Sequence, residues 1–111
     1  MTPLFPSCGK CSHPAIKAAK QCKQAMILAN AHQPEQAEAL LRQALGVLRQ
    51  SNLPMVRAKV LNSLGLVYAQ QDRRQKAHSC FSMSLRLVER HVGLDNWLYT
   101  RIAENKKRLA S

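Results

Sequence analysis

Acidic side chains are scarce in this chain of 111 residues, which contains 6 Asp and Glu against 17 Lys and Arg and carries a formal net charge of +11. This excess favours acidic partners, whether nucleic acid, anionic lipid or an acidic protein face. Alternatively, the basic residues only solvate outer helix faces, because they are spread along the whole chain. Aromatic residues are also few, at 5%, and none is interleaved with basic residues as a base-stacking platform requires. We therefore expect an acidic or amphipathic segment of another protein as the partner, with a basic nucleic-acid-associated adaptor as the alternative.

Long apolar runs are absent as well, since no window of about 18 apolar residues occurs. The sequence therefore predicts no membrane span and no membrane partner. The opening residues, MTPLFPSCGK, lack the basic start and the apolar stretch of a secretory signal. We expect a cytoplasmic setting, in which the four cysteines are thiols rather than disulfides.

The usual patterns of an active site are also missing. The sequence contains no glycine loop that would cradle a phosphate, no nucleophile beside a base and no obvious pair of carboxylates. The most metal-like segment contains Cys8, Cys11 and His13, which could share a zinc ion. Cys22 is the nearest candidate for a fourth ligand, but there is no second pair of ligands. We expect a protein that is not an enzyme and that uses no cofactor, with this segment as a weak metal candidate.

Helical periodicity dominates what is present, and no alternating strand pattern competes with it. Residues 1–12 have no periodicity and are predicted to form a flexible N-terminal arm, which leaves residues 13–111 as one helical domain. Prolines at three places suit the first turns of helices. The predicted helices cover residues 14–31, 34 to the QSNLP segment, 55–71, 74–90 and 96–109. The fold class predicted from these elements is all-α.

The most informative segment covers residues 58–89, which read as two amphipathic helices around a short polar turn. Small residues at Gly65 and Ala77 fall where two helices would cross closely, and large residues would fill the gaps around that crossing. The full series, in chain order, is Leu61, Leu64, Gly65, Tyr68, Ala77, Phe81 and Ser84. This order of large and small residues resembles the tetratricopeptide repeat. The resemblance implies an α-α superhelix of about two helix pairs with a C-terminal capping helix.

A weaker copy of this pattern lies 40 residues upstream, where Ala37 matches Ala77 and Leu41 matches Phe81. The offset exceeds the usual repeat of about 34 residues and is similar to the longer repeats of the kinesin-light-chain type. Within each pair, the turn residue that is usually glycine is replaced by a histidine at position 32 and an aspartate at position 72. Both types tolerate a left-handed backbone better than most residues, so we expect the turns to form.

The resemblance also implies a function, that of a protein-protein interaction module such as an adaptor, scaffold or co-chaperone-like protein. In this family the first helix of each pair lines a concave groove that binds a peptide or helix of the partner. The groove residues implied here are Met26, Asn30, Lys59, Asn62, Leu66 and Gln70, with Leu98 and Ile102 reaching the groove from the last helix. Lys59 and the Asn62 amide would bind an acidic group of the partner. An uncovered apolar end face also makes a homo-oligomer a reasonable hypothesis.

Overall fold

The computed structural model describes residues 13–110, which form five α-helices and no strand. The helices are α1 (Pro14–Asn30), α2 (Pro34–Leu48), α3 (Pro54–Gln70), α4 (Arg74–Val92) and α5 (Trp97–Ala110). The predicted all-α fold is confirmed, and the predicted arm at residues 1–12 lies outside the described residues. Among the helices of residues 13–110, none has the length and apolar content needed to cross a bilayer.

Local sequence explains where the helices begin and end. The first three helices each start with proline, which has no N–H to leave unpaired in the first turn. His13 caps α1, since its Nδ1 accepts a hydrogen bond of 3.1 Å from the Ala15 N–H. Asn96 caps α5, because its Oδ1 accepts from the Tyr99 N–H at 2.8 Å. Gly93 ends α4 with a φ of 87°, a conformation that glycine adopts without strain.

The turns inside the two helix pairs share one backbone geometry. His32 and Asp72 have φ angles of 63° and 61°, in the left-handed region. In both turns the N–H of the next residue bonds, at 2.9 Å, to a carbonyl near the end of the preceding helix. These bonds satisfy carbonyls that the helix end would otherwise leave open. The predicted left-handed turns are therefore confirmed at both positions.

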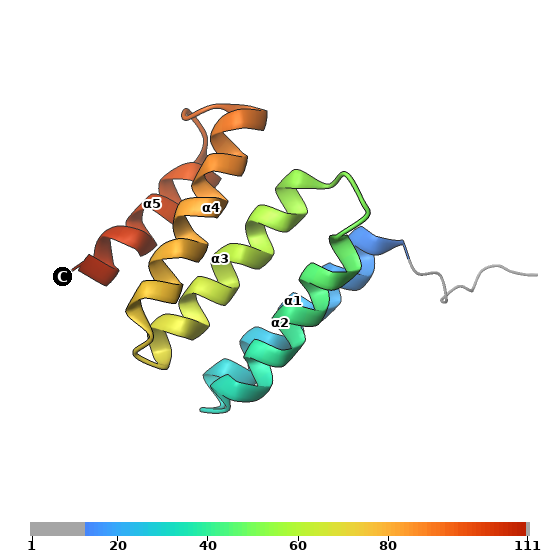
Figure 1. The fold of residues 1–111 in the computed structure, drawn as a ribbon, viewed down its shortest axis with the longest axis vertical. Coiled ribbons are helices and arrows are strands. Elements are labelled where there is room, and N and C mark those ends of the chain that lie inside the picture. Colours follow the sequence, from blue (N-terminus) through green and yellow to red (C-terminus); the bar gives the residue numbers. More distant parts are fainter. Residues whose placement is uncertain (1–12, 111) are drawn as a thin grey trace, which may run out of the picture.

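The helices form two pairs followed by a single helix (Figure 1). α1 packs on α2, α3 packs on α4, and α5 covers a side of α4. The central helix is α3, which contacts all four of the others. This position explains why the sequence of α3 is apolar on nearly every side.

The crossing of α3 and α4 depends on small residues. Phe81 of α4 is fully buried, and its ring lies directly over Gly65 of α3, so that a Cβ added at Gly65 would lie 2.6 Å from Phe81 Cε1. Elsewhere along the same contact, Ser84 is fully buried and its Oγ donates a 2.6 Å hydrogen bond to the Ala58 carbonyl. The close approach predicted at Gly65 is thus present.

Burial repeats with the predicted offset of 40 residues. Ala37 and Ala77 are both fully buried, as are Leu41 and Phe81. Further matched pairs of buried residues are Ala18 with Ala58, Ala25 with Gly65, Ala44 with Ser84 and Leu48 with Val88. The two helix pairs therefore bury equivalent faces, although their sequences match only loosely.

One prediction about α5 is wrong. Leu98 and Ile102 were expected at the concave groove, but they are 8% and 0% exposed and belong to the core. Their spacing of four residues places them on one side of α5, and this side packs on α4. The last helix therefore closes the stack with its apolar side and does not offer that side to a partner.

Candidate functional site

The predicted groove residues of α3 share one side of that helix. Spacings of three and four residues place Lys59, Asn62, Leu66 and Gln70 together, and they place Leu61, Leu64 and Tyr68 on the opposite side. We call the first side, with the neighbouring surfaces of α1 and α5, the concave face. In Figure 1, α1 and α5 lie behind α2 and α4, so the concave face points away from the reader.

Two of the predicted groove residues form hydrogen bonds to neighbouring helices. Asn62 Oδ1 accepts a bond of 2.9 Å from Asn105 Nδ2 of α5. Gln70 Nε2 donates a bond of 2.9 Å to the Ala29 carbonyl at the end of α1. These side chains therefore tie α3 to the helices on each side of it, a structural use that the sequence did not reveal. The amide nitrogen of Asn62 is not part of its bond and is the group that would bind a carboxylate.

The remaining predicted residues are available to a partner to different degrees. Lys59 and Asn30 are exposed, whereas Met26 and Leu66 are half-buried. Leu66 lines a cavity of about 280 Å³ together with Asn105 and Arg108 of α5. Sequence reasoning missed these two α5 residues, because they lie about 40 positions away from Leu66 and no local pattern connects them.

The weak metal candidate formed by Cys8, Cys11 and His13 stays a prediction. Cys8 and Cys11 lie outside the described residues, and His13 uses its Nδ1 to cap α1. The Cys22 thiol lies 3.1 Å from the Ser63 hydroxyl, at the contact of α1 with α3. Across residues 13–110, no three His, Cys, Asp or Glu side chains come together in a way that could hold a metal ion.

Glu38 of α2 connects the two helix pairs through polar contacts. Its carboxylate accepts hydrogen bonds from Tyr68 Oη at 3.2 Å and from Gln71 Nε2 at 3.3 Å. It also forms ion pairs of 3.3 Å with Arg42 and 3.1 Å with Arg73. Burial by itself would raise the pKa of Glu38, but the hydrogen bonds and the charge of Arg73 lower it below the ordinary carboxyl value.

We expect Glu38→Gln to destabilise the protein by about 1 kcal/mol near neutral pH, because an uncharged amide cannot pair with the two exposed arginines. Since folding lowers the pKa of Glu38, its stabilisation is fully present above the ordinary value of 4.5 and is lost as the pH falls through the folded value. Urea unfolding at about pH 7 and about pH 3 should therefore show a smaller difference between the variant and wild type at the lower pH.

The matched control is Glu104→Gln on α5, which removes a charge from an exposed residue. It should change the free energy of unfolding by less than about 0.5 kcal/mol at either pH. An equal loss for Glu38→Gln at both pH values would contradict the assigned role of the carboxylate.

Comparison with known proteins agrees with this architecture. A family model described as tetratricopeptide repeat matches residues 17–90, a stretch that runs from α1 into the last turns of α4. Searches of curated proteins and of solved structures return no match. The kinesin-light-chain-like subtype stays a prediction that the 40-residue offset supports. Because the match covers both helix pairs and more than half of the 111 residues, the chain belongs to the tetratricopeptide repeat family.

Proposed function

We propose that this chain is an adaptor or scaffold that binds a peptide or helix of a partner protein along its concave face. Tetratricopeptide repeats generally mediate protein-protein interaction. The observation that carries the proposal is the hollow beside Leu66, where apolar side chains lie next to two cations, Arg74 and Arg108, and one acid, Asp72. An apolar anchor next to a cation is suited to a peptide that presents an apolar side chain and a carboxylate.

The charge of the chain supports an acidic partner. Its net charge is +11, and Lys59 on the concave face is exposed without an ion pair to any described residue. A carboxylate of the partner near Lys59 would accept a charge-assisted hydrogen bond from the Lys59 ammonium group. In the absence of a partner, that ammonium group bonds to water instead. Long-range attraction would also speed the encounter with an acidic segment.

The experiment begins with a displayed library of acidic peptides selected on the wild-type chain. Selected peptides should bind Lys59→Glu about tenfold more weakly, a loss of ~1.4 kcal/mol, because attraction becomes repulsion. Asn62→Ala should weaken binding by a smaller factor, since it removes one amide donor. Fluorescence anisotropy of labelled peptides measures both affinities.

The matched control is Lys17→Glu, which makes the same change of charge on an exposed residue of α1, on the side away from the concave positions. It should bind the peptides as wild type does. If Lys17→Glu and Lys59→Glu weaken binding equally, the effect comes from net charge and the concave site is wrong. Tight binding of an oligonucleotide that falls steeply with salt would instead favour the nucleic-acid alternative.

A further inference from the structure

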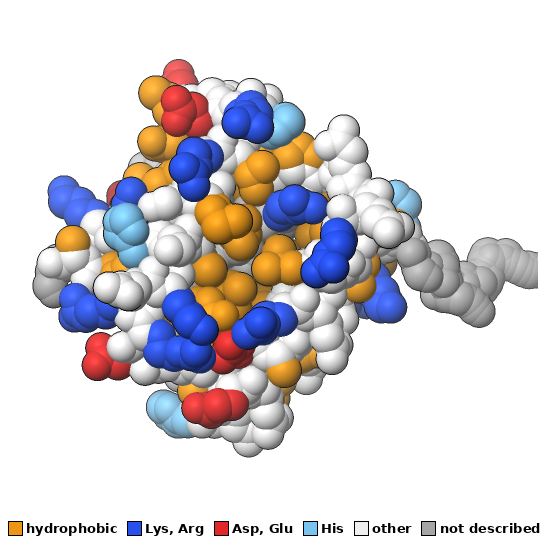
Figure 2. Space-filling view, viewed as in Figure 1, with side chains coloured by type: hydrophobic (Ala, Val, Ile, Leu, Met, Phe, Trp, Pro, Cys, Tyr) orange, Lys and Arg blue, Asp and Glu red, His pale blue; other side chains and the backbone are white. Residues whose placement is uncertain are grey.

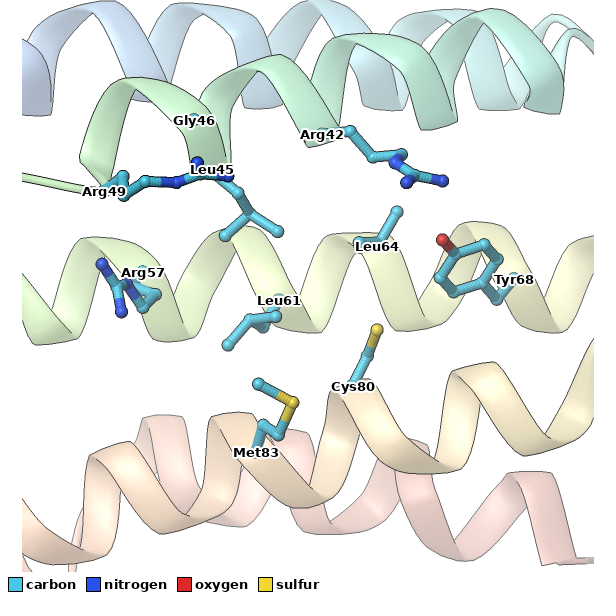
Figure 3. Close-up of a pocket in the computed structure, with 10 residues that line it drawn as sticks. All are labelled: Arg42, Leu45, Gly46, Arg49, Arg57, Leu61, Leu64, Tyr68, Cys80 and Met83. Carbon is cyan, nitrogen blue, oxygen red and sulfur yellow. The ribbon is translucent and has the colours of Figure 1, made fainter.

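A second hollow lies on the opposite side of α3. Within residues 13–110, α2 and α4 do not contact each other, so a strip of α3 remains between them. Figure 3 shows Leu61, Leu64 and Tyr68 along this strip, with Leu45 from α2 above them and Met83 from α4 below. The hollow has a volume of about 470 Å³ and continues past Met83 toward the end of α4. We call it the arginine groove, for the residues described next.

The rim of this groove is positively charged along both walls. Arg42 lies on α2 and Arg49 directly after its end, Arg57 lies on α3, and Arg86 and Arg90 lie on α4. In the described part of the chain, no acidic residue lines the groove. Figure 2 shows an apolar centre with Lys and Arg side chains around most of it and with acidic atoms at its lower edge.

These arginines differ in what they already bind. Arg42 pairs with Glu38, and Arg57 donates a 3.1 Å hydrogen bond to the Leu48 carbonyl. Arg49, Arg86 and Arg90 form no ion pair with any of the acidic residues, all of which lie in the described part. Three guanidinium groups, one on the α2 wall and two on the α4 wall, are therefore free to bind carboxylates.

The centre of the groove is suited to apolar side chains. Met83 is 46% exposed, and it lines the groove next to other apolar side chains, so together they form an apolar surface that a partner can cover. The flexible thioether of Met83 adapts to partners of different shape. Leu45 is half-buried beside it, above the nearly buried Leu61. A partner with leucine-like residues on one side would cover this surface.

Charge complementarity selects among the possible occupants. A second copy of the chain would bring another net charge of +11 against the arginines. Residues 1–12 of the same chain contain Lys10 and no acid, so they would not neutralise the rim. Nucleic acid would use the arginines but not the apolar centre, where Tyr68 is only 6% exposed and cannot serve as a stacking platform.

We propose that the arginine groove binds an acidic amphipathic helix of another protein, separately from the concave face. Leucine-like residues of that helix lie over Leu61 and Met83. Acidic residues on one flank meet Arg49, and those on the other flank meet Arg86 and Arg90. The two faces of α3 thus bind two different segments, which would let this chain connect partners as a scaffold does.

The probe is a fluorescein-labelled helical peptide of about 18 residues, with leucines along one face and glutamates on both flanks. It should bind the full wild-type chain saturably at about 0.15 M salt. The double variant R49E/R86E should bind about tenfold more weakly or worse, because both rims then repel the glutamates. Replacing the probe's leucines by asparagines, with its charge unchanged, should also reduce the affinity about tenfold, since the apolar centre then has no partner.

Three controls separate this proposal from the alternatives. The double variant K17E/K20E makes the same change of charge on α1 and should bind within about twofold of wild type. Lys59→Glu should leave this probe unaffected, so that failure here and failure of the concave site can be told apart. Because Arg49 and Arg86 are exposed, their variants should keep the wild-type helical content and melting temperature.

Several results would overturn the proposal. These are the absence of saturable binding, equal loss in R49E/R86E and K17E/K20E, or full affinity for the asparagine probe. Displacement of the probe by a single-stranded oligonucleotide of about 20 nucleotides, together with full affinity for the asparagine probe, would assign the groove to nucleic acid instead.

Discussion

Gly65→Val is expected to destabilise the protein by about 3 kcal/mol, because the valine side chain would need space that the Phe81 ring already fills. A Cβ at position 65 would lie 2.6, 2.8 and 2.9 Å from Phe81 Cε1, Cδ1 and Cζ. Real Cβ atoms do not approach carbon so closely, so the buried ring or the helix backbone would have to shift to admit the new side chain. Thermal unfolding followed by circular dichroism should show a melting temperature lower by at least about 12 °C.

The chain supplies a matched control for this substitution. Gly46 is also inside a helix, but a Cβ built there meets nothing within 4 Å. Gly46→Ala should therefore stabilise the protein by up to about 1 kcal/mol, since alanine favours the helix more than glycine does. Gly65→Ala has the same gain in helix propensity but also the clash, so it should be less stable than Gly46→Ala. Equal stability of the two alanine variants would show that the approach of α3 and α4 is looser than the structure has it.

Phe81→Ala is expected to cost about 3–5 kcal/mol, the usual range for truncating a fully buried aromatic side chain. The ring fills the space between α3 and α4 over Gly65, so truncating it to alanine leaves a cavity at that contact. Because small domains are stable by only about 5–15 kcal/mol, much of the folding free energy would be lost. Urea unfolding measured by circular dichroism would give the value.

A combined variant tests whether the two residues act on one contact. In Gly65→Ala with Phe81→Leu, the smaller leucine leaves space for the added methyl group. The combined loss should then be smaller than the sum of the single losses by about 0.5 kcal/mol or more. Strict additivity would mean that the ring and the glycine do not limit each other, contrary to the observed distances.

Much of the architecture could be predicted from the sequence, because the signals that carry it are local. A proline at the start of a helix and a histidine or aspartate in a tight turn act within a few residues. The small residues Gly65 and Ala77 and the large residue Phe81 also predicted that α3 and α4 cross closely. The spacing of small and large residues fixes which helix faces can approach each other. The repeat at 40 residues extended that inference to the first pair.

The concave face was only partly predictable. Helical spacing correctly grouped Lys59 with Leu66 on one side of α3. It could not show that the Asn62 oxygen accepts a bond from Asn105, 43 positions away. Nor could it show that Ile102 faces the core, because the rotation of α5 about its own axis depends on how it packs on α4.

The sequence by itself determined the helices, the small residues at their crossing and the excess of positive charge. Only the tertiary structure decided where that charge lies, since residues from α2, α3 and α4 meet at the arginine groove. The physical reason is one of range. Turn preferences and helical periodicity depend on neighbours along the chain, whereas a groove depends on the gap that remains between α2 and α4 when both pack on α3.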